Sequence, residues 1–227
     1  MRTGQSAWDA GFNASPRVVK VTPPASQAPA SARETKEARI DMSSALQTIV
    51  PEDVLGFWFS DAVRPNWYAK DDAFDALIRD RFGTAVAAAT EGALDGWAQT
   101  PQGALALVIL LDQFPRNIHR GTPDAFSGDS RALSTAKAAI AKGFDTATQP
   151  ETRNFLYLPF MHSETLADQE HGMTLYAAND VADGLKYMTL HRDIIARFGR
   201  FPHRNAVLDR LSTQEELDFL QQPGSSF

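Results

Sequence analysis

The residues best suited to chemistry occur in two similar phrases of the sequence. QFPRN spans residues 113–117 and RFPHRN spans residues 200–205, so each phrase delivers Phe-Pro and then arginine and asparagine. The guanidinium group of arginine is planar and can donate two parallel hydrogen bonds to a carboxylate or a phosphate. With their flanks, residues 112–120 and 191–205 hold six arginines and three histidines against two aspartates. In a chain with a net charge of −6, this local excess of cations either serves an anionic ligand or is neutralised internally by Asp112, Glu164 and Asp168.

Asp112 lies beside the first phrase and follows the apolar run of residues 104–111. At the end of a helix, the macrodipole disfavours a carboxylate by about 0.3 to 1 kcal/mol. An unpaired buried carboxylate costs several kcal/mol more, so a cationic partner is expected. Arg116, Arg200 and Arg204 are the candidates. One interpretation is a buried ion pair with Asp112 that fixes two helix ends. The other is that some of these guanidinium groups bind a ligand. The sequence leaves both interpretations open.

A second polar group, HSETLADQ, begins at His162. At 100° per residue, Glu164 and Asp168 share one helical face, whereas His162 and Gln169 point nearly the opposite way. This separation disfavours a compact metal site that uses both His162 and Glu164. A set of Glu164, Asp168 and His191 lacks the spacing of known zinc motifs. No metal site is therefore predicted.

Histidines are the candidates for proton transfer, because their charge changes near neutral pH. His191 shares a helical face with two isoleucines, so we expect it to point into the core. His162 and His203 are the candidate catalytic residues, and Glu164 and Asp168 are expected to orient them or set their pKa values.

Helices must position these residues, because helix signals dominate from residue 51 onward and no convincing strand pattern follows. Proline stands at the first helical position in Thr-Pro and Gln-Pro pairs. Ser212 and Glu215 have the spacing of a capping box. The sequence predicts an all-α fold of about eight helices, near residues 51–60, 71–91, 101–114, 123–142, 150–177, 179–198, 203–209 and 213–221.

Two of these helices are apolar on every side, which places them in the interior. They contain residues 103–111 and 155–161. Residues 132–144 combine small side chains with a glycine stop, as in the second helix of a tetratricopeptide hairpin. We therefore expect tetratricopeptide-like antiparallel helical hairpins, although no 34-residue repeat is evident.

Composition limits the function classes. The chain has 227 residues, 43% of them hydrophobic, which suits one globular domain. We expect a Pro/Ala/Ser-rich disordered extension over residues 1–41 and a single all-α domain over residues 42–227. The absence of cysteine excludes disulfides and thiolate sites and is compatible with the cytoplasm. The acidic balance disfavours nucleic acid, and the longest apolar run is too short for a membrane span.

Five motifs give the chain a resemblance to a known family. They are VLGFWF (54–59), LLDQFPRNIHRGTPDAF (110–126), FLYLPFMHSE (155–164), DQ (168–169) and FGRFPHRN (198–205). Together they resemble the bacterial domain of unknown function 924 family over residues 51–227. The resemblance implies an all-α, tetratricopeptide-like fold and no established activity or cofactor. The one modest departure is Asp209, where a glycine would be more usual in the family.

The leading hypothesis is a cytoplasmic helical protein whose Arg/His/Asp/Glu pocket binds a small anionic ligand; the sequence does not say whether it is an enzyme. The expected ligand-binding residues are Asp112, Gln113, Arg116, Asn117, Glu164, Asp168, Gln169, His191, Arg200, Arg204 and Asn205. No cofactor is identified, and the oligomeric state is left open.

Two other interpretations compete with this one. The first is a non-enzymatic tetratricopeptide-like interaction module that receives a peptide or protein partner. The second is an internal polar network that only fixes the helix arrangement. Replacing Arg204 separates them, because a structural arginine is needed for stability and a ligand-binding one is not.

Overall fold

The computed structural model describes residues 49–179, 181 and 183–226. Within these residues every regular element is a helix and no strand occurs, which confirms the predicted all-α fold. The extension predicted over residues 1–41 lies outside the described residues. The single domain predicted over residues 42–227 stays a prediction.

The first half of the described residues alternates α-helices with short 3₁₀ and π segments. In chain order these are α2 (Pro51–Trp58), η1 (Arg64–Asn66), α3 (Asp72–Thr90), η2 (Asp95–Gln99), α4 (Pro101–Val108), the π segment η3 (Ile109–Gln113), α5 (Phe114–Ile118) and η4 (Pro123–Phe126). Proline opens α2 and α4, where its fixed φ favours a helix and its missing N–H is not needed.

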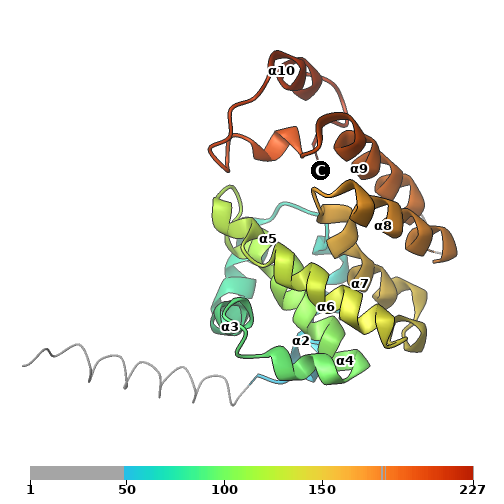
Figure 1. Cartoon of the computed structure of the whole chain (residues 1–227). Coiled ribbons are helices and arrows are strands. Elements are labelled where there is room, and N and C mark those ends of the chain that lie inside the picture. The colour runs from blue at the N-terminus through green and yellow to red at the C-terminus, as the bar shows by residue number, and fades with distance from the viewer. Residues whose placement is uncertain (1–48, 180, 182, 227) are drawn as a thin grey trace, which may run out of the picture. The chain divides into compact units, whose positions relative to one another are not determined.

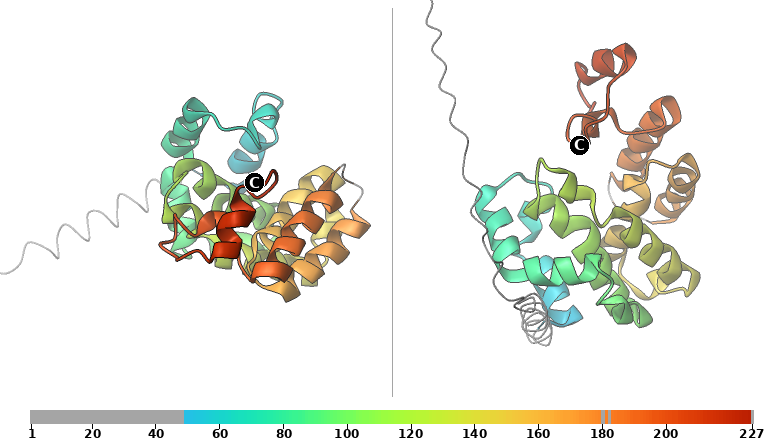
Figure 2. Two further views of the ribbon diagram at one scale, coloured as in Figure 1. Left: turned by 90° about the horizontal axis from the view of Figure 1, so that it is seen from above. Right: turned by 60° about the vertical axis from the view of Figure 1, so that its left-hand side comes forward.

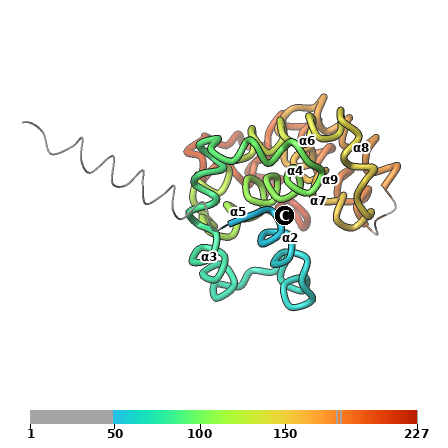
Figure 3. The backbone as a smooth tube through the Cα atoms, turned by 90° about the horizontal axis from the view of Figure 1, so that it is seen from below, coloured from blue at the N-terminus to red at the C-terminus, as the bar shows by residue number. Residues whose placement is uncertain are grey.

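The second half contains the longer paired helices. In chain order these are α6 (Asp129–Ala141), η5 (Asp145–Ala147), α7 (Pro150–His162), α8 (Leu166–Ala178), α9 (Gly184–Phe198), η6 (Pro202–Arg204) and α10 (Gln214–Leu220). Helices α7, α8 and α9 lie side by side, and α6 contacts both α4 and α7 (Figures 1 and 3). The tetratricopeptide-like packing stays a prediction.

α4, η3 and α5 run without a break and form one buried rod. Thr100 caps its start, because the Thr100 hydroxyl accepts a hydrogen bond from the Gly103 N–H at 3.1 Å. Residues 103–114 are all buried, as expected for a helix that is apolar on every side. The rod continues past the predicted end at residue 114, so the polar residues that follow the apolar run belong to the rod itself.

The π segment precedes Pro115. Proline has no N–H for the carbonyl of Leu111, four residues earlier, and its ring crowds that carbonyl. A π turn accommodates both the missing N–H and the crowding by the proline ring. The start of α6 passes close to the same carbonyl: a Cβ on Gly128 would stand 2.0 Å from the Leu111 oxygen. Glycine is therefore required there, and the acidic start of α6 is held against the polar end of the rod.

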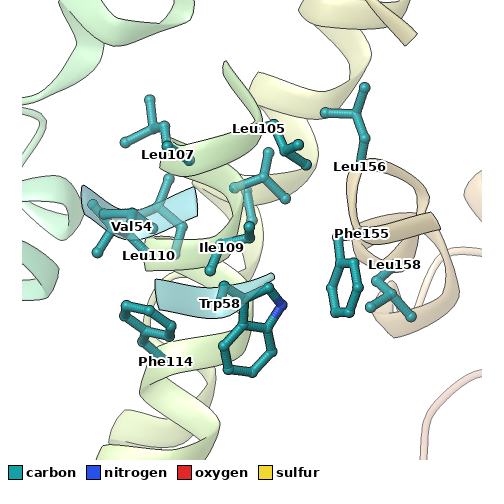
Figure 4. Packing of buried hydrophobic residues seen from close by; sticks show 14 of the residues in the cluster. Val54, Trp58, Leu105, Leu107, Ile109, Leu110, Phe114, Phe155, Leu156 and Leu158 are labelled. Carbon is teal, nitrogen blue, oxygen red and sulfur yellow. The ribbon is translucent and has the colours of Figure 1, made fainter. Parts of the chain in front are cut away.

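Aromatic side chains from three helices form the centre of the core (Figure 4). The Trp58 ring lies edge-on to Phe114 and Phe155, with centroid distances of 5.5 and 5.7 Å. Trp58 has no exposed surface, so it belongs to the core rather than to the wall of a pocket. These contacts fix the rod against α2 and α7.

The prediction of one helix over residues 150–177 is wrong, because α7 ends at His162 and α8 begins at Leu166. Gln169 stabilises the break: its Nε2 donates to the carbonyls of Met161 and Ser163 at 2.9 and 2.6 Å. These carbonyls would otherwise lack a helical donor. The single helical face expected for Glu164 and its neighbours therefore does not exist.

The helix predicted over residues 123–142 is also divided, into η4 and α6. The helix predicted over residues 203–209 is instead the short 3₁₀ turn η6. The capping box of α10 is formed by Thr213 and Glu216, one residue later than predicted. The chain after α9 lies over the end of α5 (Figures 1 and 2). None of the described helices is both long and apolar enough to cross a membrane.

Candidate functional site

A cavity of about 690 Å³ lies where the rod, α7 and α9 meet the part of the chain that follows α9, which we call the C-terminal segment. Seven of the predicted site residues line it: Gln113, Arg116, Asn117, His162, His191, His203 and Arg204. The fold therefore brings the two Phe-Pro phrases to one space, although their role in binding stays a prediction.

The other predicted site residues do not line the cavity. They are Asp112, Glu164, Asp168, Gln169, Arg200 and Asn205. Asn205 Nδ2 donates to Ser212 Oγ at 3.1 Å. Asp168 accepts from Ser163 Oγ at 3.0 Å and pairs with Lys137. The geometry makes these residues supports of the surrounding structure rather than direct contacts for a ligand.

Asp112 is fully buried behind the cavity wall. Its Oδ1 lies 2.7 Å from His162 Nδ1 and 3.4 Å from Arg116 Nη1, and its other oxygen accepts from Gln113. Burial alone would raise the pKa of this carboxyl, but Arg116 and His162 hold it well below its usual range. Of the three arginines expected as partners, Arg116 has this role. The residue that holds His162 is thus Asp112. Glu164 acts instead on the other candidate histidine, because its charge raises the pKa of His203 against the larger lowering effects of burial and Arg204.

Asp129, in the first turn of α6, joins the two cavity arginines. Arg116 donates to its carboxylate through Nη1 at 2.7 Å and Nη2 at 3.1 Å, and Arg204 Nη1 lies 3.4 Å from Asp129 Oδ2. Sequence reasoning missed Asp129, because an acid in the first turn of a helix is common for dipole reasons alone.

Arg204 is 7% exposed and lies between two aromatic rings. Its guanidinium carbon is 4.7 Å from the centroid of Phe126 and 4.5 Å from that of Phe201. Among the described residues, only Nη1 of its guanidinium has a hydrogen-bond partner, and Nε is buried without one. Burial and the nearby Arg116 lower the pKa of Arg204 to about 10.

Three histidines line the cavity, and burial lowers the pKa of each. The pKa of His191 falls to about 3 and that of His203 to about 4. Burial and Arg116 also lower the pKa of His162, despite the opposing effect of Asp112. His191 is buried, in keeping with its expected inward position, and its Nδ1 donates to the Tyr187 carbonyl at 2.8 Å. All three rings are therefore neutral near pH 7.

Arg120 is a cavity residue that was not selected from the sequence. Its Nε and Nη2 donate to Asp75 at 2.7 and 2.9 Å, and Asn117 Nδ2 donates to the same carboxylate at 2.8 Å. Burial favours a higher pKa for Asp75, but hydrogen bonds from Arg120 and Asn117 lower it. Asp75 was also missed, since it lies on α3, far from either phrase in the sequence.

Two ion pairs hold the C-terminal segment, and we call them the clamp pairs. In the first, Arg210 donates to Glu164 at 2.6 and 3.0 Å, and the Phe201 N–H adds a bond of 2.8 Å. In the second, Arg200 donates to both oxygens of Glu216 at 2.7 and 2.8 Å. Both oxygens of each carboxylate are bound by an arginine, so the clamp pairs serve the fold.

Part of the cavity wall is aromatic and aliphatic. Trp67, Tyr68, Leu158, Met161 and Tyr187 all contribute. Tyr68 is 75% exposed and Tyr187 is 46% exposed, so these two rings lie toward solvent. The sequence of an aromatic pair such as Trp67 and Tyr68 carries no signal that separates packing from ligand contact.

No carboxylate is present among the described residues that line the cavity, whereas three arginines are. Asp75, Asp112 and Asp129 lie behind the lining residues, and each forms an ion pair with a lining arginine. The part of the chain described by the structure also contains no group of three or more His, Asp or Glu residues arranged to hold a metal ion. The arrangement suits hydrogen bonding to an anion and proton transfer by a neutral imidazole.

Comparison with known proteins identifies the family of the chain. The model for bacterial proteins of unknown function (DUF924) matches residues 54–224. A solved structure, that of the protein of unknown function ATU0120 from Agrobacterium tumefaciens, is 43% identical, with a TM-score of 0.72. The match covers 75% of this chain and 96% of that one. None of the curated proteins matches the chain.

Proposed function

The chain belongs to the DUF924 family of bacterial proteins of unknown function, and we propose that its cavity binds a small organic anion. The anionic group, a carboxylate or a phosphate, would lie against Arg116 and Arg204. The body of the ligand would extend toward the aromatic and aliphatic wall.

The state of Arg204 carries this proposal. A buried guanidinium is costly unless its N–H groups are paired. Arg204 is buried, yet among the residues that the structure describes only its Nη1 is hydrogen-bonded, through a long contact of 3.4 Å to Asp129. Phe126 and Phe201 hold the guanidinium in place from two sides. A ligand oxygen would supply a charge-assisted hydrogen bond to a group that is already fixed in position.

Arg116 adds positive charge without needing the ligand for its own bonding. Its Nη1 and Nη2 are bound to Asp129, and Nη1 also donates to the Asp112 carbonyl at 2.7 Å. Because no described lining residue is acidic, an anion in the cavity meets no direct repulsion from the described part of the wall. The neutral histidines can donate or accept hydrogen bonds without competing as ions.

The apolar wall supports an organic ligand over a bare inorganic ion. Leu158 and Met161 are buried on α7, and Tyr187 on α9 stands at the more exposed side. Small-molecule sites usually combine an apolar surface with a few polar groups that fix orientation. A cavity of about 690 Å³ is within the size range of such sites.

A thermal-shift series with the full chain tests the proposal. The probes are phenyl phosphate and benzoate, with inorganic phosphate, acetate and uncharged benzyl alcohol for comparison. A ligand at about 100 times its Kd adds about 2.7 kcal/mol, which raises the Tm of a protein of this size by about 5 to 10 °C. We expect this rise with at least one of the two aromatic anions, a smaller one with the bare anions, and none with benzyl alcohol.

Two variants make the series specific. Arg204→Met keeps an apolar stem and removes the cation, so the ligand-induced rise should disappear. Arg197→Met is the matched control, because Arg197 also stacks on phenylalanine rings, at 4.6 and 5.7 Å, but lies outside the cavity. A rise of equal size in wild type and Arg204→Met, or no rise with any anion, would overturn the proposal.

The alternative, a tetratricopeptide-like module for a peptide or protein partner, has weaker support. The polar side chains gather at one cavity rather than along an extended helical face. A cytoplasmic location belongs to our proposal and rests on the cysteine-free sequence.

A further inference from the structure

We propose that His162 is a general base that removes a proton from the anion bound in the cavity, with Asp112 as its positioning residue. This inference rests on the proposed anion binding and adds a reaction to it. The substrate class is an organic carboxylate or phosphate with an acidic C–H or O–H next to its anionic group.

The contact between Asp112 and His162 fixes which nitrogen can act. An ionised carboxylate only accepts hydrogen bonds, so His162 Nδ1, 2.7 Å from Asp112 Oδ1, must carry the proton. The basic lone pair is then on Nε2. His162 lines the cavity, and its side chain is 15% exposed, so a ligand can reach the ring. This is the arrangement in which a carboxylate holds an imidazole in the tautomer required for catalysis.

Asp112 is itself held rigidly. It belongs to the π segment of the buried rod, has no exposed surface, and accepts hydrogen bonds from Gln113 and His162 while Arg116 lies 3.4 Å away. A buried carboxylate that needs its own polar partners gives the fold little that apolar side chains would not. Buried polar groups of this kind, together with a π turn, are typical of functional sites.

The charged groups around His162 favour a neutral imidazole. Burial and Arg116 lower its pKa, while Asp112 and Asp129 oppose this change. His191, on α9, lies with its ring centroid 6.3 Å from that of His162 and is also neutral. The His162 ring is therefore ready to accept a proton at neutral pH.

The reaction is balanced within the site. The Nε2 lone pair takes the proton from the substrate C–H or O–H, and the electron pair of that bond stays on the substrate. The imidazolium that forms is stabilised by Asp112. Arg116 and Arg204, which hold the anionic group, also stabilise the negative charge that develops on the substrate. In the reverse direction, the same proton returns from Nε2.

Iodoacetate tests the reactivity of Nε2, because the chain has no cysteine to compete for it. The Nε2 lone pair attacks the CH₂ carbon, iodide leaves, and a carboxymethyl imidazolium remains with its Nδ1–H toward Asp112. Uncharged iodoacetamide is the matched reagent, and each rate is divided by that with N-acetylhistidine. We expect iodoacetate to label His162 at Nε2 at least tenfold faster than iodoacetamide does, as read by peptide mass spectrometry.

Variants assign this preference to its causes. Arg204→Met should remove most of the preference for iodoacetate, whereas Arg197→Met should keep it. Phenyl phosphate should protect His162. Asp112→Asn should slow labelling by both reagents, because an amide no longer fixes the tautomer. If that variant does not fold, ¹⁵N NMR of the wild-type imidazole gives the same information: we expect Nδ1 protonated and Nε2 unprotonated near pH 7.

Equal or slow labelling of His162 by both reagents, preferential labelling of another histidine, or the opposite tautomer would overturn the assignment of the base. If phenyl phosphate still raised the Tm in such a case, anion binding would stand without the reaction. If phenyl phosphate neither bound nor protected, the proposed function would fail as well.

Discussion

Arg200 and Arg204 lie four residues apart in the same Phe-Pro phrase, yet the structure uses them in opposite ways. Arg200 is bound to both oxygens of Glu216 and to the Leu211 carbonyl. Arg204 is the more buried of the two, and its one hydrogen bond to a described residue is a long one, to Asp129. Similar residues in one motif therefore divide into a clamp for the fold and a group left available for a ligand.

The pKa directions express the same difference. The hydrogen bond to Glu216 raises the pKa of Arg200, so the folded state favours its charge. Burial and Arg116 lower the pKa of Arg204, so the folded state disfavours its charge. A buried cation whose charge lowers the stability of the fold is expected at a functional site. Variants of the two groups should consequently differ in what they change.

The largest effect on stability should come from Asp112→Ala. The substitution leaves Arg116 with one carboxylate fewer and His162 without its partner in a buried site. Breaking a buried charge pair costs about 3 to 5 kcal/mol. Urea unfolding measures this loss. A loss below about 1 kcal/mol would show that the site does not depend on this carboxylate.

Glu164→Ala breaks the first clamp pair and should have the next largest effect. It removes two bonds from Arg210 and one from the Phe201 N–H. Hydrogen bonds to charged groups contribute about 1.5 to 3 kcal/mol, so we expect a loss of about 2 kcal/mol in urea unfolding. The affinity for phenyl phosphate, measured by calorimetry, should change less than threefold.

Glu215→Ala is the matched control for that variant. Glu215 is mostly exposed and pairs with Arg197 at the surface, where such pairs contribute about 0.2 to 1 kcal/mol. A Glu164→Ala variant as stable as Glu215→Ala, or one that no longer binds phenyl phosphate, would contradict the division between clamp and cavity.

The second clamp pair should make stability depend on pH. The Arg200 hydrogen bonds lower the pKa of Glu216 to about 2, below the ordinary value of 4.5. A lowered folded-state pKa stabilises the fold above about pH 4.5, and this contribution is lost as the pH falls toward 2. The Tm difference between wild type and Glu216→Gln should be full at pH 6 and shrink steadily below pH 4.5. A difference that is constant down to pH 3 would exclude the ion pair as its cause.

The sequence was informative about the fold wherever helix signals are local. The all-α class and the buried helix over residues 103–111 follow from periodicity, and the structure bears them out. The break at residues 163–165 was missed, because the Gln169 side chain that stabilises it acts through contacts that no helical pattern reveals. The π segment likewise depends on Pro115 inside a run that otherwise reads as a plain helix.

The candidate site was predictable in part, because local motifs are visible in the sequence and tertiary contacts are not. The two Phe-Pro phrases marked Arg116 and Arg204, which do line the cavity. Arg200 could not be told apart from Arg204, because their environments depend on tertiary neighbours in α10 and α6. Asp129 could not be predicted either, because only the close approach of the chain at Gly128 brings it to Arg116 and Arg204.

The smallest effect on stability, and the most direct test of the central claim, is that of Arg204→Met in urea unfolding without ligand. Methionine keeps the packing between Phe126 and Phe201 and removes a buried cation that lacks full pairing. We expect a free energy of unfolding within about 0.5 kcal/mol of wild type, or higher. A loss of about 2 kcal/mol or more would contradict the account, because Arg204 would then be part of the structural network rather than a group held for an anion.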